Sequence, residues 1–257
     1  MGSSKNANEV AVKATSELST EVQSWGQEVN VGQDLLIPKL LLMQGMSDAV
    51  TEGKAGVGEW VDSINLTKFG SMQSPVEVIP FHVQKMWDIL TETEDGQFEW
   101  TRSEPIIESP LATGYNDNLP WNDKIDGKNI KRVRRLNFFV LIPSEVAEGI
   151  SIPYVVSFKS TTLKEGQKIL NQMYVRNQRA KLSPAAYKFK LAVGRAENDK
   201  GKWFVPVVEL GSRATDDEVK DAFNWYKTIT NSSTKVVVDE SDNKDNMQTV
   251  SADTGEF

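Results

Sequence analysis

The chain has 257 residues, a net charge of −7 at neutral pH, 39% hydrophobic residues and no cysteine. The lack of cysteine excludes disulfides, thiolate metal sites and cysteine nucleophiles, and it favours a reducing, cytoplasmic setting. The longest apolar runs, at residues 40–43 and 138–142, are too short to span a bilayer, and the polar residues 1–8 do not form a secretory signal.

Few side chains suited to catalysis are present. His82, the single histidine, lies in an apolar run over residues 78–87 that is typical of an ordinary packed or surface histidine. Neither a Gly-x-Ser-x-Gly nucleophile motif nor a glycine-rich phosphate loop occurs. Acidic residues between Glu92 and Asp126 can in principle bind Mg²⁺, but their irregular spacing among prolines and glycines favours a solvated acidic loop. We therefore expect no enzyme, metal or cofactor.

In the first half of the chain, residues 1–34 are polar with a net charge of −3, and we expect them to form a flexible acidic arm. An apolar element at residues 35–44 begins the ordered region. Alternating hydrophobic residues then predict strands at 59–66, 75–84 and 97–101. The run at 105–127, rich in Pro and Asn, predicts a long loop.

The second half continues the sheet pattern with two helices. Strands are predicted at 131–142, 150–159, 186–196 and 202–210. A helix with an apolar side is predicted at 162–181, and a second one, which starts with favourable acidic residues, at 215–230. Residues 232–257 lose periodicity and are expected to form a disordered acidic tail.

Strands outnumber helices in this pattern, with about seven strands and two or three helices. The helices are too few for a βαβ repeat. We therefore expect a mainly β (α+β) domain over residues 35–231, built as a twisted barrel of five or more strands with helices at its edge.

Charge is distributed very unevenly along the chain. Residues 128–202 hold sixteen Lys and Arg against five Asp and Glu, a net charge of +11. Residues 239–257 hold six acids against one Lys, a net charge of −5, and they end on Phe257. A basic surface tethered to an acidic tail favours a polyanion-binding protein, in which the tail competes for the basic surface and also offers a docking peptide.

Binding of a single nucleic-acid strand needs cations for the phosphates and rings for the bases. The predicted cations are Lys131, Arg132, Arg134, Arg135, Lys159, Arg176, Arg179, Lys181, Lys188 and Lys190, and the predicted rings are Tyr154, Tyr187 and Trp203. Because side chains alternate along a strand, Tyr187 and Lys188 face opposite sides, so only one of them faces a ligand. Each of these residues also fits a purely structural role. The polar residues of the helix at 162–181 leave duplex binding open.

Several segments resemble bacteriophage and bacterial single-stranded DNA-binding proteins. In the body these are Ile37-Pro-Lys-Leu followed by Gln44-Gly-Met-Ser, then Val76-Glu-Val-Ile-Pro80 and Ser157-Phe-Lys-Ser-Thr-Thr-Leu-Lys164. The tail runs from Val238-Asp-Glu-Ser-Asp to Asp253-Thr-Gly-Glu-Phe257, and tails of that family are likewise acidic and end on Phe. The chain departs from the bacterial pattern in having Thr-Gly-Glu before Phe257, where acids and Pro are usual.

The resemblance implies an oligonucleotide-binding (OB) barrel over about residues 40–230, in a virus-encoded protein of the host cytoplasm. It implies a non-catalytic protein that coats single-stranded DNA in phage replication or recombination. Replication or recombination proteins would be recruited through Asp253, Glu256 and Phe257, and a homo-oligomer is possible. Two alternatives remain: a regulator or inhibitor whose acidic ends mimic nucleic acid, and a metal-dependent nuclease. The sequence does not distinguish DNA from RNA as the ligand.

Overall fold

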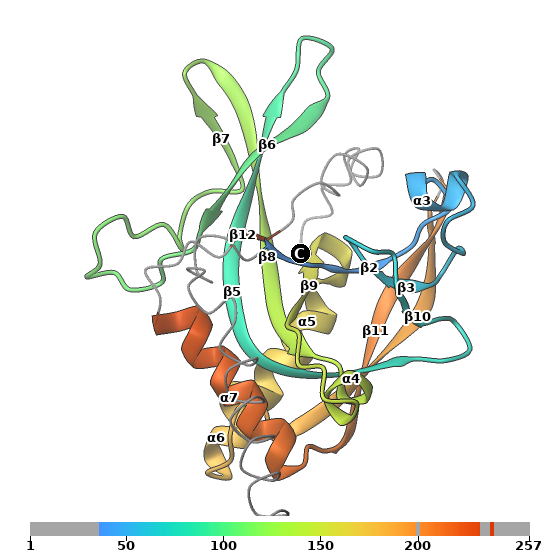
Figure 1. Ribbon diagram of the computed structural model, residues 1–257. Helices are drawn as coiled ribbons and strands as arrows, with labels where there is room; N and C mark the ends of the chain where they lie inside the picture. Colours follow the sequence, from blue (N-terminus) through green and yellow to red (C-terminus); the bar gives the residue numbers. More distant parts are fainter. Residues whose placement is uncertain (1–35, 199–200, 232–236, 239–257) are drawn as a thin grey trace, which may run out of the picture.

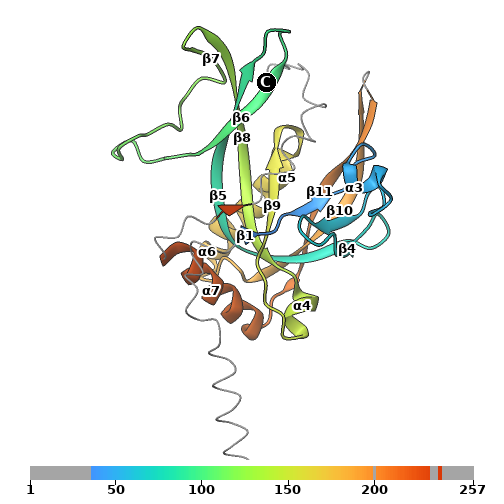
Figure 2. The same cartoon turned by 45° about the horizontal axis from the view of Figure 1, so that its top comes forward.

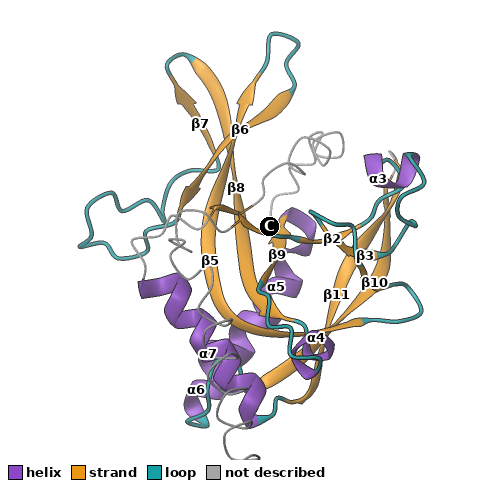
Figure 3. Ribbon diagram, in the orientation of Figure 1, coloured by secondary structure: helices purple, strands orange, loops and turns teal. Residues whose placement is uncertain are grey.

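Figure 1 shows the protein as a computed structural model, which describes residues 36–198, 201–231 and 237–238. The expected acidic arm at 1–34, and the expected tail apart from residues 237–238, lie outside these described residues. Within the described part the protein is mainly β, with three sheets and few helices (Figure 3). The mainly β class predicted from the sequence is therefore confirmed.

The largest sheet has seven antiparallel strands. They are β5 (Val76–Glu92), β6 (Phe98–Pro105), β7 (Asn122–Ile125), β8 (Lys128–Leu141), β9 (Tyr154–Lys159), β10 (Tyr187–Asn198) and β11 (Gly201–Arg213). The pairing order is β11-β10-β5-β8-β7, with β6 added to β5 and β9 added to β8.

Two small sheets and several helices complete the described structure. The three-stranded sheet contains β2 (Leu40–Leu42), β3 (Trp60–Asp62) and β4 (Lys68–Gly70), and the parallel pair contains β1 (Leu36–Ile37) and β12 (Val237–Val238). The α-helices are α3 (Asp48–Thr51), α4 (Pro143–Ala147), α5 (Leu163–Asn171), α6 (Asn177–Arg179) and α7 (Asp216–Asn231). A 3₁₀ turn, η1 (Ser160–Thr162), precedes α5, and a π-helical turn, η2 (Gln172–Arg176), follows it.

Strand β5 joins the body of the protein to an outer extension. Its first residues, 76–78, pair with β10, and residues 79–91 pair with β8. Residues 86–92 pair with β6 on the other edge of β5. The register shifts between Pro80 and His82, and such bulges bend and twist a strand. The sequence predicted a strand only to residue 84, because the continuation carries Lys85 and Asp88 among its apolar residues.

Two hydrophobic clusters pack against opposite faces of the strands. The first contains Leu136, Phe138 and Phe158 of the sheet together with Ile169 of α5. A Cβ at Gly166 would lie 2.9 Å from the Cβ of Phe158, so a glycine is needed for this close approach of α5. On the other face, the second cluster includes Phe81, Phe139 and Val155 of the sheet and Ala222 of α7, and Figure 1 shows α7 beside β5.

The barrel expected from the sequence does not close in the described residues, because β9 and β11 are not paired. Other groups occupy the free edges. The Val155 N–H of β9 donates to the Pro38 carbonyl (2.9 Å). On β11, the Gln44 side chain accepts from the Phe204 N–H (2.9 Å) and donates to its carbonyl (3.0 Å), and Glu165 accepts from the Val208 N–H (2.6 Å). A backbone carbonyl at the edge of β9 and side chains at the edge of β11 thus take the place of pairing between these two strands, and the sheet stays open.

Both predicted helices are present, with local differences. The helix predicted at 162–181 is the continuous series η1, α5, η2 and α6, which ends at Arg179. Buried Asn177, in the last turn, connects the series to the segment that follows: its side-chain amide accepts from Gln172 Nε2 (2.8 Å) and donates to the carbonyls of Ser183 and Pro184, both at 3.1 Å. These bonds turn the chain towards β10.

Candidate nucleic-acid interface

The outer parts of β5 and β8, together with β6, β7 and the intervening loops, form a projecting arm, residues 84–135. The arm and the β10–β11 hairpin extend from the same side of the body in two views (Figures 1 and 2). Because side chains alternate along the strands, the arm has two faces of different composition. We call them the Phe98 face, with Phe98, Trp100 and Lys131, and the Trp87 face, with Lys85, Trp87 and Arg134.

On the Phe98 face, two rings and a cation lie together. Phe98 and Trp100 are alternate residues of β6, and Trp100 and Lys131 both pair with Leu90 of the central strand β5. Lys131 Nζ lies 4.0 Å from the centroid of the Phe98 ring. All three side chains are partly exposed. This arrangement supplies flat apolar surface and positive charge at one place.

A buried charged group forms the base of the same face. Arg135 is 1% exposed; its Nη2 lies 3.4 Å from Asp88 Oδ1 and donates to Ser103 Oγ (3.1 Å). Ser103 in turn donates to Asp88 Oδ1 (2.7 Å). Lys159, the residue paired with Arg135 on β9, places its Nζ 4.0 Å from Asp88 Oδ2. Arg135 therefore holds strands together and cannot reach a ligand in this conformation, whereas Lys159 is partly exposed.

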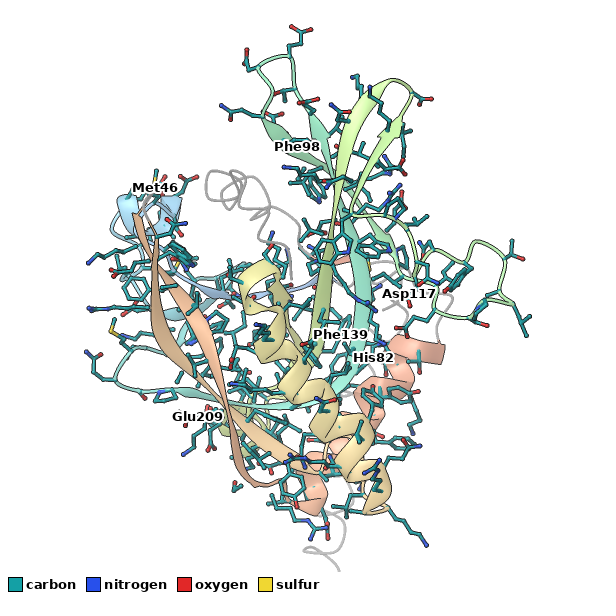
Figure 4. The ribbon with its side chains drawn as sticks, turned by 180° about the vertical axis from the view of Figure 1, so that it is seen from behind. Met46, His82, Phe98, Asp117, Phe139 and Glu209 are labelled. Carbon is teal, nitrogen blue, oxygen red and sulfur yellow. The ribbon has the colours of Figure 1, made fainter. Side chains whose placement is uncertain are left out.

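The Trp87 face is covered by the loop at residues 106–121, and its cations are paired with acids. Arg132 is 5% exposed; its Nη1 lies 3.0 Å from Asp123 Oδ2 and donates to the Pro120 carbonyl (2.9 Å). Hydrogen bonds from the Lys124 N–H and from Arg132 lower the pKa of Asp123. Arg134 Nη2 lies 3.3 Å from Glu108 and 3.1 Å from Asp117. In Figure 4, Phe98 and Asp117 lie on opposite sides of the arm.

The three rings predicted from the sequence lie in the body or on the hairpin. Tyr154 is 5% exposed, packs edge-on against Phe69 with ring centroids 5.3 Å apart, and donates its hydroxyl to Glu145 Oε1 (3.0 Å). Burial, and then the bond to Glu145, raise the pKa of the Tyr154 hydroxyl. Tyr187 packs against the first hydrophobic cluster, and Trp203, near the tip of the hairpin, is partly exposed. Burial leaves Tyr154 unable to stack on a base.

The remaining predicted cations are not gathered at the arm. Lys188 Nζ lies 2.7 Å from Glu218 Oε1 of α7, and Lys190 is exposed on β10. The other three, Arg176, Arg179 and Lys181, are exposed at the end of the helical series, and Figure 1 shows α6 at the end of the molecule opposite β6 and β7. The structure thus places the predicted cations in three groups: on the arm and the adjoining strand β9, on β10, and at the end of the helical series.

Phe98 and Trp100 were not among the three rings predicted from the sequence. Phe98 and Trp100 are alternate residues of the strand that follows the Glu94–Gly96 turn, and the strand before this turn also alternates. This hairpin pattern in the sequence places the two rings on one face. The predicted docking residues Asp253, Glu256 and Phe257 lie outside the described residues. Within the described ranges, no group of three or more His, Asp or Glu side chains is arranged to hold a metal ion.

No helix in the described part of the chain is long and apolar enough to cross a membrane. Comparison with curated proteins and with solved structures finds no match. One family does match, and its description is "Pam3 phage gp34-like protein". The match covers residues 7–235, which include all seven strands of the large sheet, the projecting arm at residues 84–135 and both predicted helices. Since the match extends over most of the sequence, the chain belongs to the Pam3 phage gp34-like protein family.

Proposed function

We propose that this phage protein binds single-stranded DNA without catalysing a reaction, and that it coats the strand during DNA replication or recombination in the host cytoplasm. The observation that carries the proposal is the order of the body strands, β9-β8-β5-β10-β11, with α5 between β9 and β10 in the chain. The family match indicates a phage protein and names no activity.

An OB fold is a five-stranded, partly open barrel that binds oligonucleotides on its second and third strands and on two flanking loops. The first of these loops joins strands one and two, and the other joins strands four and five. We assign β5, β8, β9, β10 and β11 to these five positions. In this assignment the arm replaces the first loop, and the turn of the β10–β11 hairpin is the second. The unpaired edges of β9 and β11 correspond to the open side.

The chemistry of the Phe98 face supports a single-stranded ligand. A single strand exposes the flat faces of its bases, which stack on aromatic rings with about 1–3 kcal/mol per base. Phe98 and Trp100 provide two partly exposed rings on one face, and Lys131 and Lys159 provide charges for the phosphates. A duplex keeps its base faces stacked inside, so these rings favour the single strand over the duplex.

The acidic C-terminal segment completes the proposal. Residues 239–257 carry a net charge of −5 against the net +11 of residues 128–202. We infer that this segment competes with DNA for the basic surface, and that Asp253, Glu256 and Phe257 recruit replication or recombination proteins. The pairing of charge with a terminal ring suits a short docking peptide, in which the ring anchors and the acids select a basic partner.

The proposal is tested by titrating a fluorescently labelled oligothymidine and a labelled duplex of equal length with the full chain. We expect tight binding of the single strand, weaker binding of the duplex, and no cleavage with Mg²⁺. Absence of binding to either DNA would reject the proposal and favour the regulator that mimics nucleic acid. Cleavage of the single strand in Mg²⁺ would instead favour a nuclease.

A further inference from the structure

The Trp87 face of the arm combines aromatic rings and cations, as the Phe98 face does, but the loop at residues 106–121 contacts these side chains. Lys85 and Trp87 lie on β5, and Arg134 pairs with Trp87 across the strands. The Arg134 guanidinium carbon lies 6.0 Å from the centroid of the Trp87 ring. A second ring, Trp121, packs edge-on against Trp87 with centroids 6.5 Å apart and remains 61% exposed. The face therefore combines two partly exposed cations, Lys85 and Arg134, with one exposed ring.

Glu108 bridges the two cations. Both of its carboxylate oxygens accept from Lys85 Nζ, at 2.6 and 2.7 Å, and Oε1 also lies 3.3 Å from Arg134 Nη2. A carboxylate placed between Lys and Arg resembles a phosphate group, which offers oxygens to the same donors. Glu108 is thus positioned as a phosphate would be in a bound nucleic acid.

The ion pairs of Arg134 with Glu108 and with Asp117 have poor geometry. Charge-assisted N–H···O bonds prefer about 2.7–2.9 Å, whereas Glu108 lies 3.3 Å from Arg134. Asp117 Oδ1 lies 3.1 Å from Arg134 Nη2 but accepts no hydrogen bond among the described residues. The Glu108 side chain is also 44% exposed, so water can solvate it once it is displaced. A ligand with better geometry can therefore replace the loop carboxylates.

The loop that carries Glu108 is fixed at both ends. The Ile106 N–H donates to the Lys85 carbonyl (2.8 Å), and the Arg132 N–H donates to the Trp121 carbonyl (2.7 Å). Between these ends, Trp87 Nε1 donates to the Asn116 carbonyl (2.9 Å). Displacement of Glu108 thus needs only a rotation of its side chain, and the backbone that presents Trp121 stays in place.

We propose that Lys85 and Arg134 form a second phosphate subsite for single-stranded DNA, that Glu108 occupies it in the free protein, and that Trp121 stacks on the neighbouring base. This inference rests on the proposed function and extends it to the other face of the arm. A bound strand contacts Lys85, Arg134 and Trp121, and Glu108 turns to solvent. The internal acid competes with DNA, so it lowers affinity most when salt is low.

The test compares Glu108→Gln with the wild-type full chain, using a labelled oligothymidine at low and at physiological salt. Glu99→Gln is the matched control, because it removes one negative charge from an exposed position of the same arm. We expect Glu108→Gln to bind about three- to tenfold tighter at low salt, because it removes two partly exposed ion pairs that compete with DNA. The gain should shrink at physiological salt, and Glu99→Gln should change affinity much less.

Two further variants identify the residues involved. Adding Arg134→Gln to Glu108→Gln should remove the gain, and Trp121→Ala should weaken binding several-fold without changing the thermal midpoint. If the wild type binds the oligonucleotide while Glu108→Gln binds no tighter than Glu99→Gln, the second subsite is contradicted and the proposed function stands. If neither the wild type nor Glu108→Gln binds, both the subsite and the proposed function are contradicted.

Discussion

Lys131 Nζ lies over the Phe98 ring, 4.0 Å from its centroid. The two residues are brought together because β6 and β8 flank the same strand, with Leu90 of β5 paired to Trp100 on one side and to Lys131 on the other. A cation over an exposed ring contributes about 0.5–1 kcal/mol. This contact restrains the ring and holds a positive charge beside it, the combination that a stacked nucleotide with its phosphate requires.

The first prediction concerns the two rings of the Phe98 face. Phe98→Ala and Trp100→Ala should each weaken single-strand binding by about 1–3 kcal/mol, because each removes a surface on which a base stacks. Binding is measured by fluorescence anisotropy, and folding by circular dichroism. Phe223→Ala is the control, since that ring is 55% exposed on α7, away from the arm. Unchanged affinity in both ring variants would place the stacking surface elsewhere.

The second prediction separates the structural role of Arg135 from the DNA-binding role proposed for Lys131. Arg135→Met should destabilise the fold by about 3–5 kcal/mol, because it leaves the buried Asp88 carboxylate without its guanidinium partner. Lys131→Met should leave stability nearly unchanged and weaken DNA binding. Urea unfolding measures the first effect and anisotropy the second. Equal stability of the Arg135→Met variant and the wild type would show that the buried pair is not needed for folding.

The third prediction uses two neighbouring lysines of β10. Lys188 is paired with Glu218 at 2.7 Å, and Glu218 also accepts from the Thr215 N–H (2.8 Å) at the start of α7, whereas Lys190 is exposed. Lys188→Met should therefore lower the free energy of unfolding by about 1–3 kcal/mol. Lys190→Met should have little effect on it. If the two variants unfold at the same urea concentration, the pair with Glu218 does not stabilise the fold.

The same pair gives a pH dependence with a definite sign. Burial disfavours the charge of Glu218, but hydrogen bonds from Lys188 and from Thr215 outweigh it and lower the pKa of Glu218 below its ordinary value of 4.5. A carboxyl with a lowered pKa stabilises the fold above the unfolded-state pKa, and this stabilisation is lost as pH falls through the folded-state pKa. The wild type should therefore be more stable than Glu218→Gln at pH 7, and the difference should vanish as pH falls below the lowered pKa of Glu218. Urea unfolding at several pH values measures it.

The fourth prediction concerns the acidic C-terminal segment. Deletion of residues 239–257 removes a net charge of −5, so it should tighten DNA binding at low salt and leave the unfolding midpoint unchanged. The gain should shrink as salt rises and the Debye length falls below about 8–10 Å. A chain of full length with the six acids changed to Asn or Gln should behave like the deletion. A deletion that binds no tighter at low salt would contradict competition by this segment.

Local patterns in the sequence predicted much of the fold. The alternation at 131–142 and 202–210 corresponds to β8 and β11, and the apolar periodicity at 162–181 corresponds to the series from η1 to α6. The Thr-Asp-Asp-Glu sequence at the start of the last helix forms two reciprocal hydrogen bonds. The Thr215 N–H donates to the Glu218 carboxylate, and the Glu218 N–H donates to Thr215 Oγ1 (3.3 Å). These features depend on neighbours in the chain, so the sequence reveals them.

The site depends on contacts between distant residues, and these could not be predicted from local patterns. The basic run at 131–135 suggested a cationic surface, yet Arg132 and Arg135 are buried against Asp123 and Asp88, which local pattern does not identify as their partners. The Lys131–Phe98 contact requires β5 to lie between the two strands that carry these residues. The side-chain bonds on the free edge of β11, which leave the sheet open, likewise come from a loop and a helix far away in sequence.

The dependence of affinity on salt shows whether the protein binds single-stranded DNA through phosphates and stacked bases. Affinity for a labelled oligothymidine should fall linearly on a log–log plot against salt, with a slope of about −0.7 for each phosphate neutralised. Lys131→Gln should reduce the magnitude of that slope by about 0.7, the contribution of one phosphate. The affinity for a duplex of equal length should be lower than that for the single strand at every salt concentration. Absence of measurable binding at low salt, or equal affinity for the single strand and the duplex, would show that the protein is not a single-stranded DNA-binding protein.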